Sequence, residues 1–132
     1  MKDVISILRH CGIQPTPQRI AVVEYVLKNK SHPSADEVLS SARKRCPTVS
    51  RATVYNTLNL LVEKGLLAMQ TIKEGAVVFD SNLEKHHHFI DMDTGRIYDI
   101  SWDQLQVKGK EKLKEFEVTE FQVIMRGRKK KG

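Results

Sequence analysis

The first 65 residues contain a series of helix-start signals, and these constrain the fold more than any other feature. Thr16 is an N-cap in front of Pro17, which suits the first position of a helix. Residues 34–37 read Ser-Ala-Asp-Glu, a capping box in which the first and last side chains bond reciprocally to the backbone. Ser50 is placed to cap a further helix from residue 51 to about residue 64. With a short apolar stripe near the N-terminus, the sequence predicts four helices.

Two β-prone segments follow these helices. Residues 66–72 and 76–79 are rich in apolar and β-branched side chains, and the Lys-Glu-Gly of residues 73–75 separates them as a turn. Three helices followed by a β-hairpin are typical of a winged helix-turn-helix, a module that places one helix in the DNA major groove.

The character of the chain changes after Asp80, and residues 81–84 form a short polar connector. We expect strands over residues 86–90 and 96–100, joined by a turn, and then an amphipathic helix over residues 102–114. Alternating apolar residues over 116–125 predict a last strand. The predicted fold class is therefore α+β, with an N-terminal winged helix-turn-helix lobe and a small C-terminal α/β lobe.

Composition narrows the classes of function. The formal net charge is +6 with a pI near 9.4, which favours an anionic partner, with nucleic acid ahead of membrane. No apolar run approaches the roughly 20 residues of a membrane-spanning helix, and the N-terminus lacks a signal-peptide pattern, so we expect neither a membrane nor a secreted protein. The two cysteines, Cys11 and Cys46, form no Cys-x-x-Cys pair, so a thiolate zinc site is not expected.

The helix predicted from residue 51 has the two faces of a DNA-reading helix. On a 3.6-residue wheel, one side holds Val54, Thr57, Leu58, Leu61 and Val62, and the opposite side holds Ala52, Asn56 and Asn59, with Leu60 also outward. Small and amide side chains suit the major groove, where Asn can bond an adenine edge. A plain amphipathic surface helix would show the same pattern, so the wheel alone leaves both interpretations open.

The second chemical signal is the run His86-His87-His88, followed by several aspartates. Residues i and i+2 of a strand share a face, so His86 and His88 point one way and His87 the other. A turn near residue 93 brings Asp99 opposite His88. Two imidazoles and a carboxylate make half of a divalent metal site, which His32 or Asp80 can complete, although a polar surface strand has the same pattern. Without thiolates, such donors suit Fe²⁺, Mn²⁺ or Zn²⁺.

Taken together, four segments resemble the ferric uptake regulator superfamily in content and order. They are the string His-Pro-Ser-Ala-Asp-Glu-Val at residues 32–38, the run from Ser50 to Leu58, the Phe-Asp that ends the hairpin at residues 79–80, and the His-x-His at residues 86–88. The resemblance implies a cytoplasmic, homodimeric, metal-activated transcription repressor that binds a pseudo-palindromic double-stranded DNA operator. It implies a winged-helix DNA-binding domain over residues 1–80, a hinge over 81–84, and a dimerisation and metal-sensing domain over 85–132.

Within that superfamily the chain is most similar to the peroxide-sensing repressors. That branch implies one regulatory divalent metal per subunit, Fe²⁺ or Mn²⁺ with Zn²⁺ also possible, held by His32, Asp80, His86, His88 and Asp99. It also implies that peroxide acts by metal-catalysed oxidation of His32 or His86. The residues expected to contact DNA are Arg19, Ser50, Arg51, Thr53, Tyr55 and Asn56.

The chain also departs from the superfamily pattern. Asp91 and Thr94 stand where the first Cys-x-x-Cys pair of a structural zinc is common, so we expect no structural zinc held by four cysteines. Gln14 replaces a residue that is often basic and near the minor groove. Two alternatives of function stay open at this point. One is a sensor of iron or another divalent metal on the same fold, and the other, more remote, is a non-haem Fe²⁺ enzyme.

Overall fold

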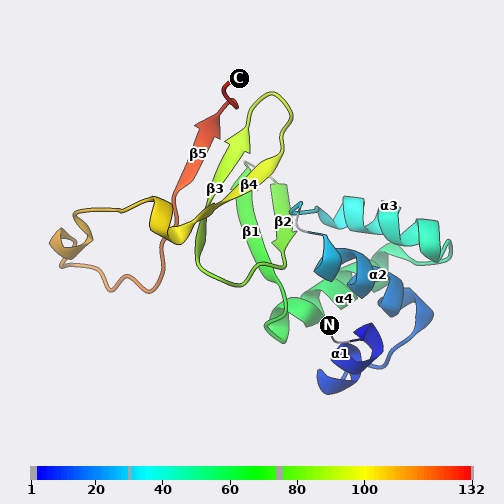
Figure 1. Cartoon of the computed structure of the whole chain (residues 1–132). Helices are drawn as coiled ribbons and strands as arrows, with labels where there is room; N and C mark the ends of the chain where they lie inside the picture. The colour runs from blue at the N-terminus through cyan, green and yellow to red at the C-terminus, as the bar shows by residue number, and fades with distance from the viewer. Residues whose placement is uncertain (1–2, 30, 74–75, 132) are drawn as a thin grey trace. The chain divides into compact units, whose positions relative to one another are not determined.

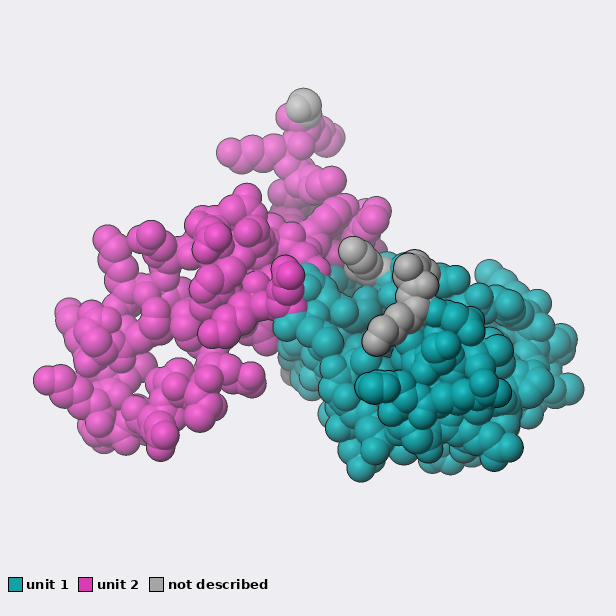
Figure 2. Space-filling model, turned by 60° about the horizontal axis from the view of Figure 1, so that its bottom comes forward, with its two compact units in different colours: residues 1–83 teal, residues 84–132 magenta. Residues whose placement is uncertain are grey.

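The computed structural model describes residues 3–29, 31–73 and 76–131, and it divides into two compact units. Unit 1 covers residues 1–83 and unit 2 covers residues 84–132, coloured separately in Figure 2. The predicted hinge, residues 81–84, spans this division, and the functions assigned to the two domains stay predictions. Within the described residues, no helix is long and apolar enough to cross a membrane.

Unit 1 contains the four predicted helices (Figure 1), and the capping signals explain where they begin. The Thr16 hydroxyl accepts a hydrogen bond from the Arg19 N–H, and Ser34 and Glu37 form the reciprocal capping box. The Ser50 hydroxyl accepts from the Thr53 N–H at 3.1 Å. The helices are α1 (Val4–His10), α2 (Pro17–Lys28), α3 (Ala35–Arg45) and α4 (Arg51–Glu63).

A two-stranded sheet completes unit 1. Strands β1 (Ala68–Lys73) and β2 (Ala76–Asp80) pair antiparallel, as predicted, although part of the predicted turn, residues 74–75, lies outside the described residues. The Phe79 N–H donates to the Pro33 carbonyl at 2.9 Å, which fastens β2 beside the start of α3. Fully buried leucines and valines from all four helices form one apolar core beneath the hairpin.

Unit 2 is a three-stranded sheet with strand order β4-β3-β5. Strand β3 (His86–Asp91) pairs antiparallel with β4 (Ile97–Ser101) and parallel with β5 (Ile124–Gly127). The β3–β4 register sets His88 opposite Asp99, as the hairpin prediction required. Figure 1 shows β3 between its two neighbours, so the histidine run lies on the central strand.

The helix predicted over residues 102–114 is wrong. The segment contains only two 3₁₀ turns, Trp102–Gln104 and Lys110–Lys112. Between them, Gly109 adopts φ 95°, a left-handed conformation that interrupts a right-handed helix. Four lysines between residues 108 and 114 also repel one another, and Leu113, which the predicted helix would turn inward, is 50% exposed.

The last strand is shorter and later than predicted. It covers Ile124–Gly127 rather than residues 116–125. A strand needs a neighbour for its backbone hydrogen bonds, and the pairing with β3 begins at His88 and Ile124. Phe116 and Val118, whose alternation suggested the strand, are 67% and 49% exposed.

Candidate metal centre and nucleic-acid interface

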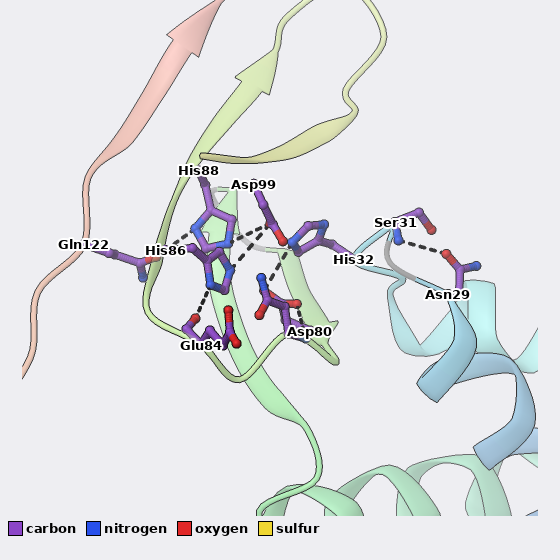
Figure 3. A network of polar contacts seen from close by, with 10 residues as sticks. Asn29, Ser31, His32, Asp80, Glu84, His86, His88, Asp99 and Gln122 are labelled. Atoms are coloured by element: carbon purple, nitrogen blue, oxygen red, sulfur yellow. Dashed lines mark hydrogen bonds and ion pairs between the residues drawn. The ribbon is translucent and has the colours of Figure 1, made fainter. Parts of the chain in front are cut away.

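In unit 2, His86, His88 and Asp99 converge on one face of the sheet; we call them the unit 2 cluster. Their ligand atoms lie within 4.8 Å of one another. Nε2 of His86 is 3.5 Å from Oδ1 of Asp99, and Nε2 of His88 is 3.7 Å from the same oxygen. Figure 3 shows both imidazoles turned toward this carboxylate. His88 is fully buried, so the cluster is not the polar surface strand that the sequence also allowed.

Hydrogen bonds on the far side of each ring define which nitrogen faces Asp99. His86 Nδ1 lies 2.5 Å from the Glu84 carbonyl, and His88 Nδ1 lies 2.8 Å from Oε1 of Gln122. Both partners are oxygen acceptors, so each Nδ1 carries the proton and donates it. In the neutral imidazoles, the Nε2 lone pairs then point at a carboxylate. That arrangement is repulsive until a proton or a cation lies among the three groups.

His87 has the opposite arrangement. Its Nδ1 accepts a hydrogen bond from the Val123 N–H at 2.9 Å, so its proton lies on Nε2. The ring is buried and stacks on Trp102, with centroids 4.5 Å apart and planes inclined by 14°. As the strand alternation predicted, His87 is not part of the cluster. It packs within unit 2.

Unit 1 contains a second His–Asp pair, formed by His32 and Asp80; we call it the unit 1 pair. His32 Nε2 is 3.2 Å from Oδ2 of Asp80, and both side chains are almost completely buried. His32 precedes Pro33 at the start of α3, and Asp80 ends β2, so the bond between Phe79 and Pro33 brings them together. Sequence spacing could not predict this contact, because His32 and Asp80 lie far apart along the chain.

The donor chemistry of both groups fits a divalent metal. Imidazole nitrogens and carboxylate oxygens without thiolate are the ligands that iron, manganese and zinc share in proteins. A buried aspartate such as Asp80 is also rare unless it is paired or holds a metal. All five predicted ligands belong to one of the two groups, two in the unit 1 pair and three in the unit 2 cluster.

The turn that follows β3 contains no cysteine, and hydrogen bonds organise it. Asp91 Oδ1 accepts from the Asp93 N–H at 2.9 Å, and Oδ2 accepts from the Thr94 hydroxyl at 3.0 Å. The bond from the Asp93 backbone is the main reason that the pKa of the Asp91 carboxyl lies below its ordinary value. The Met92 N–H donates to the Gly127 carbonyl, so this turn is also fastened to the end of β5.

Helix α4 presents the two faces that the wheel predicted. Val54, Thr57, Leu58 and Leu61 are buried in the core of unit 1. Ala52, Asn56 and Asn59 are exposed on the other face. The helix therefore has an outward surface of small and amide groups, which are side chains that suit contact with base edges in the major groove.

The remaining residues expected at DNA have partners within unit 1. Arg51 pairs with Asp36 of α3, and the hydrogen bond that its guanidinium donates to this carboxylate raises the pKa of Arg51. Arg19 donates to the Gln14 carbonyl at 3.0 Å. Ser50 and Thr53 cap the start of α4. Tyr55 is 43% exposed, beside the amide surface.

Sequence reasoning missed Gln122. It lies 34 residues from His88 and just before β5, in a segment predicted to be one continuous strand. Nothing in its local sequence marks it, because the contact depends on the parallel pairing of β5 with β3.

The comparison with known families decides the class of protein. A family profile described as "Ferric uptake regulator family" matches residues 10–126. The chain belongs to this family. It is 34% identical over 105 residues to the peroxide-responsive repressor of Staphylococcus epidermidis, a match that covers 80% of this chain and 70% of that protein.

Solved structures agree on the fold. The Campylobacter jejuni peroxide stress regulator superposes with a TM-score of 0.67 and 28% identity, covering 99% of this chain and 98% of that one. The Pseudomonas aeruginosa ferric uptake regulator, solved with manganese, superposes with a TM-score of 0.70 and 25% identity, covering 98% of this chain and 100% of that one. The protein is accordingly a transcriptional regulator of a metal-binding family and not a non-haem iron enzyme.

Proposed function

We propose that this ferric uptake regulator family protein is a metal-dependent, DNA-binding repressor that senses peroxide. The observation that carries the proposal is the unit 2 cluster. Two imidazole nitrogens, each with its lone pair held toward the same Asp99 oxygen, need a positive charge among them. A divalent metal supplies that charge with the ligand types present.

The unit 1 pair completes the proposed ligand set. One Fe²⁺ or Mn²⁺ per subunit, or Zn²⁺ in its place, is held by His32 and Asp80 together with the three residues of the unit 2 cluster. A metal shared in this way would limit the motion of the two units about the hinge at residues 81–84. It thereby selects the arrangement of the two units that binds DNA, as a ligand shifts a population toward the state it binds best.

Peroxide sensing follows from the choice of metal. Fe²⁺ held by these five residues would supply redox catalysis toward hydrogen peroxide that Mn²⁺ does not supply readily. In the net reaction, one oxygen atom of the peroxide would be inserted at a ring C–H of His32 or His86 and the other would leave as water, so that two electrons pass from the imidazole to the peroxide. The oxidised ring is a poor ligand, and its loss releases the hinge and the DNA. The similarity to the Staphylococcus and Campylobacter peroxide regulators supports this branch.

The proposed DNA partner is a pseudo-palindromic operator in the cytoplasm, read by two copies of α4. The exposed Asn56 and Ala52 reach base edges, whereas Arg19 and Arg51 contact phosphates. A homodimer sets its two reading helices in successive major grooves, about 34 Å apart.

The segment 108–120 supports a second copy of this chain as the dimer partner. Residues 108–114 carry four lysines and one glutamate, and residues 115–120 carry three glutamates. In a dimer with a two-fold axis, two antiparallel copies of this segment would place the basic half of one copy against the acidic half of the other. The exposed Phe116 and Val118 lie in the acidic half and would be covered. Phe116→Asp should therefore convert a sedimenting dimer to monomer, and an unchanged dimer would place the interface elsewhere.

One experiment tests the proposed function. DNA is selected from a random pool with Mn²⁺-loaded protein, and its affinity is then measured with Mn²⁺, with Fe²⁺ and with chelator, before and after peroxide. We expect binding with either metal, loss with chelator, and loss after peroxide with Fe²⁺ alone. Mass spectrometry should find a +16 Da shift on the His32 or His86 peptide of the Fe²⁺ sample.

The outcomes separate the alternatives. Metal-dependent binding that peroxide does not affect would make the protein a metal-availability sensor. Release by peroxide without the mass shift would exclude histidine oxidation as the cause. Binding that is indifferent to chelator would remove the metal from the mechanism.

A further inference from the structure

We propose that Gln122 is a positioning residue that prepares His88 to bind the regulatory metal. The inference rests on the proposed metal site, and it adds a residue outside the ligand set. Gln122 contacts the ligand imidazole on the side away from Asp99 (Figure 3).

The hydrogen bond between Gln122 and His88 selects one tautomer. The amide Oε1 lies 2.8 Å from His88 Nδ1, and an amide oxygen can only accept, so the ring proton is held on Nδ1. Nε2 is then the deprotonated nitrogen, 3.7 Å from Oδ1 of Asp99. A metal needs this nitrogen without its proton, because imidazole coordinates through a lone pair.

The backbone around Gln122 makes this contact a fixed part of the sheet. The next residue, Val123, accepts the His88 N–H through its carbonyl at 3.0 Å, and its own N–H donates to His87 Nδ1 at 2.9 Å. Pairing of β5 with β3 then begins at Ile124, opposite His88. Two hydrogen bonds between the Val123 backbone and adjacent histidines thus hold the chain at the residue next to Gln122.

Loss of this acceptor has a predictable effect on the metal. Without it, the ring proton of His88 can occupy either nitrogen and the ring can rotate, so metal binding must first restore the correct tautomer and orientation. Removal of such an outer hydrogen-bond partner typically weakens metal binding by about tenfold to a hundredfold. His86 has the Glu84 carbonyl in the same role, which side-chain substitution cannot remove.

The test compares three substitutions in the full chain. Gln122→Met keeps the length and volume of the side chain but removes the acceptor. Gln122→Glu keeps an oxygen at that position. Gln106→Met is the matched control, because Gln106 is an exposed glutamine of the same unit. Mn²⁺ affinity is measured by calorimetry, and ¹⁵N NMR of the metal-free proteins reports the tautomer of His88.

We expect the metal-free wild type to show His88 protonated on Nδ1, and Gln122→Met to shift it toward the Nε2–H form. The Mn²⁺ dissociation constant should rise by about tenfold to a hundredfold in Gln122→Met. Gln122→Glu and Gln106→Met should both retain metal affinity. An unchanged tautomer, or unchanged Mn²⁺ affinity, in Gln122→Met would overturn the role of Gln122. Absence of Mn²⁺ binding in the wild type would instead overturn the proposed function.

Discussion

His32 has a backbone conformation that few residues other than glycine adopt. Its φ is 59°, and it precedes a proline, a position that normally favours extended backbone. A left-handed conformation costs a residue with a side chain about 1–2 kcal/mol. The conformation places the buried ring against Asp80, and strain of this kind concentrates at functional sites.

Substitution of His32 separates this strain from the loss of the imidazole. His32→Ala and His32→Gly both remove the ring, but glycine adopts positive φ without steric cost. We expect the glycine variant to be more stable than the alanine variant by about 1 kcal/mol, although both lose metal binding. Urea unfolding of the two metal-free variants measures the difference. Equal stabilities would mean that residue 32 is not strained.

At the scale of elements, polar contacts hold the turn between β3 and β4 to the end of β5, in a unit that contains no cysteine. Asp91 accepts bonds from Asp93 and Thr94 inside the turn. Arg128, just beyond β5, pairs with Asp93 at 2.9 Å, so the turn and the end of β5 are joined by side chains as well as by backbone. Polar contacts thereby join the C-terminal end of β3 to the C-terminal end of β5.

The lowered pKa of Asp91 predicts an acid-labile contribution to stability. A carboxyl group with a lower pKa in the folded state stabilises the fold above its unfolded pKa, near 3.8, and loses that effect as pH falls through the folded value. Asp91→Asn should therefore destabilise the protein at neutral pH. The difference in unfolding free energy between Asp91→Asn and the wild type should shrink below about pH 4.

Unfolding free energies measured from neutral pH down into the acid range check this prediction. Asp103→Asn, an exposed carboxyl of the same unit, is the control and should leave the pH profile close to that of the wild type. A difference between wild type and Asp91→Asn that stays constant over the acid range would show that the Asp91 charge does not contribute.

At the scale of the whole molecule, the proposed metal joins the two compact units, so metal affinity and DNA affinity must be linked. Any factor by which the metal strengthens DNA binding is the factor by which DNA strengthens metal binding. His86→Ala removes one proposed ligand from the unit 2 cluster. We expect it to weaken Mn²⁺ binding and metal-dependent DNA binding together, while unit 1 keeps its fold.

Parallel titrations of Mn²⁺ and of selected DNA measure this linkage. His10→Ala, an exposed histidine at the end of α1, is the control. His87 is unsuitable for that purpose, because it is buried and accepts a backbone hydrogen bond. Loss of Mn²⁺ binding without any change in DNA affinity would separate the metal from DNA recognition.

The sequence by itself determined the features that depend on neighbouring residues. Thr16, Ser34 and Ser50 bond to backbone groups three residues away, so the starts of α2, α3 and α4 are readable from the chain. The faces of α4 and the alternation of the histidine run follow from the 3.6-residue and two-residue periods. The β3–β4 register could be predicted because a short turn joins two strands that follow one another in the chain.

Tertiary structure alone decided the features that depend on distant contacts. The apolar residue Leu113 suggested a helix, but it is 50% exposed in the structure, so packing does not stabilise a helix over this segment. The contact of Gln122 with His88 arises because β5 pairs in parallel with β3, and no local pattern specifies a parallel partner. Helix caps and strand alternation are short-range effects, whereas burial and strand pairing depend on which distant residues the fold brings together.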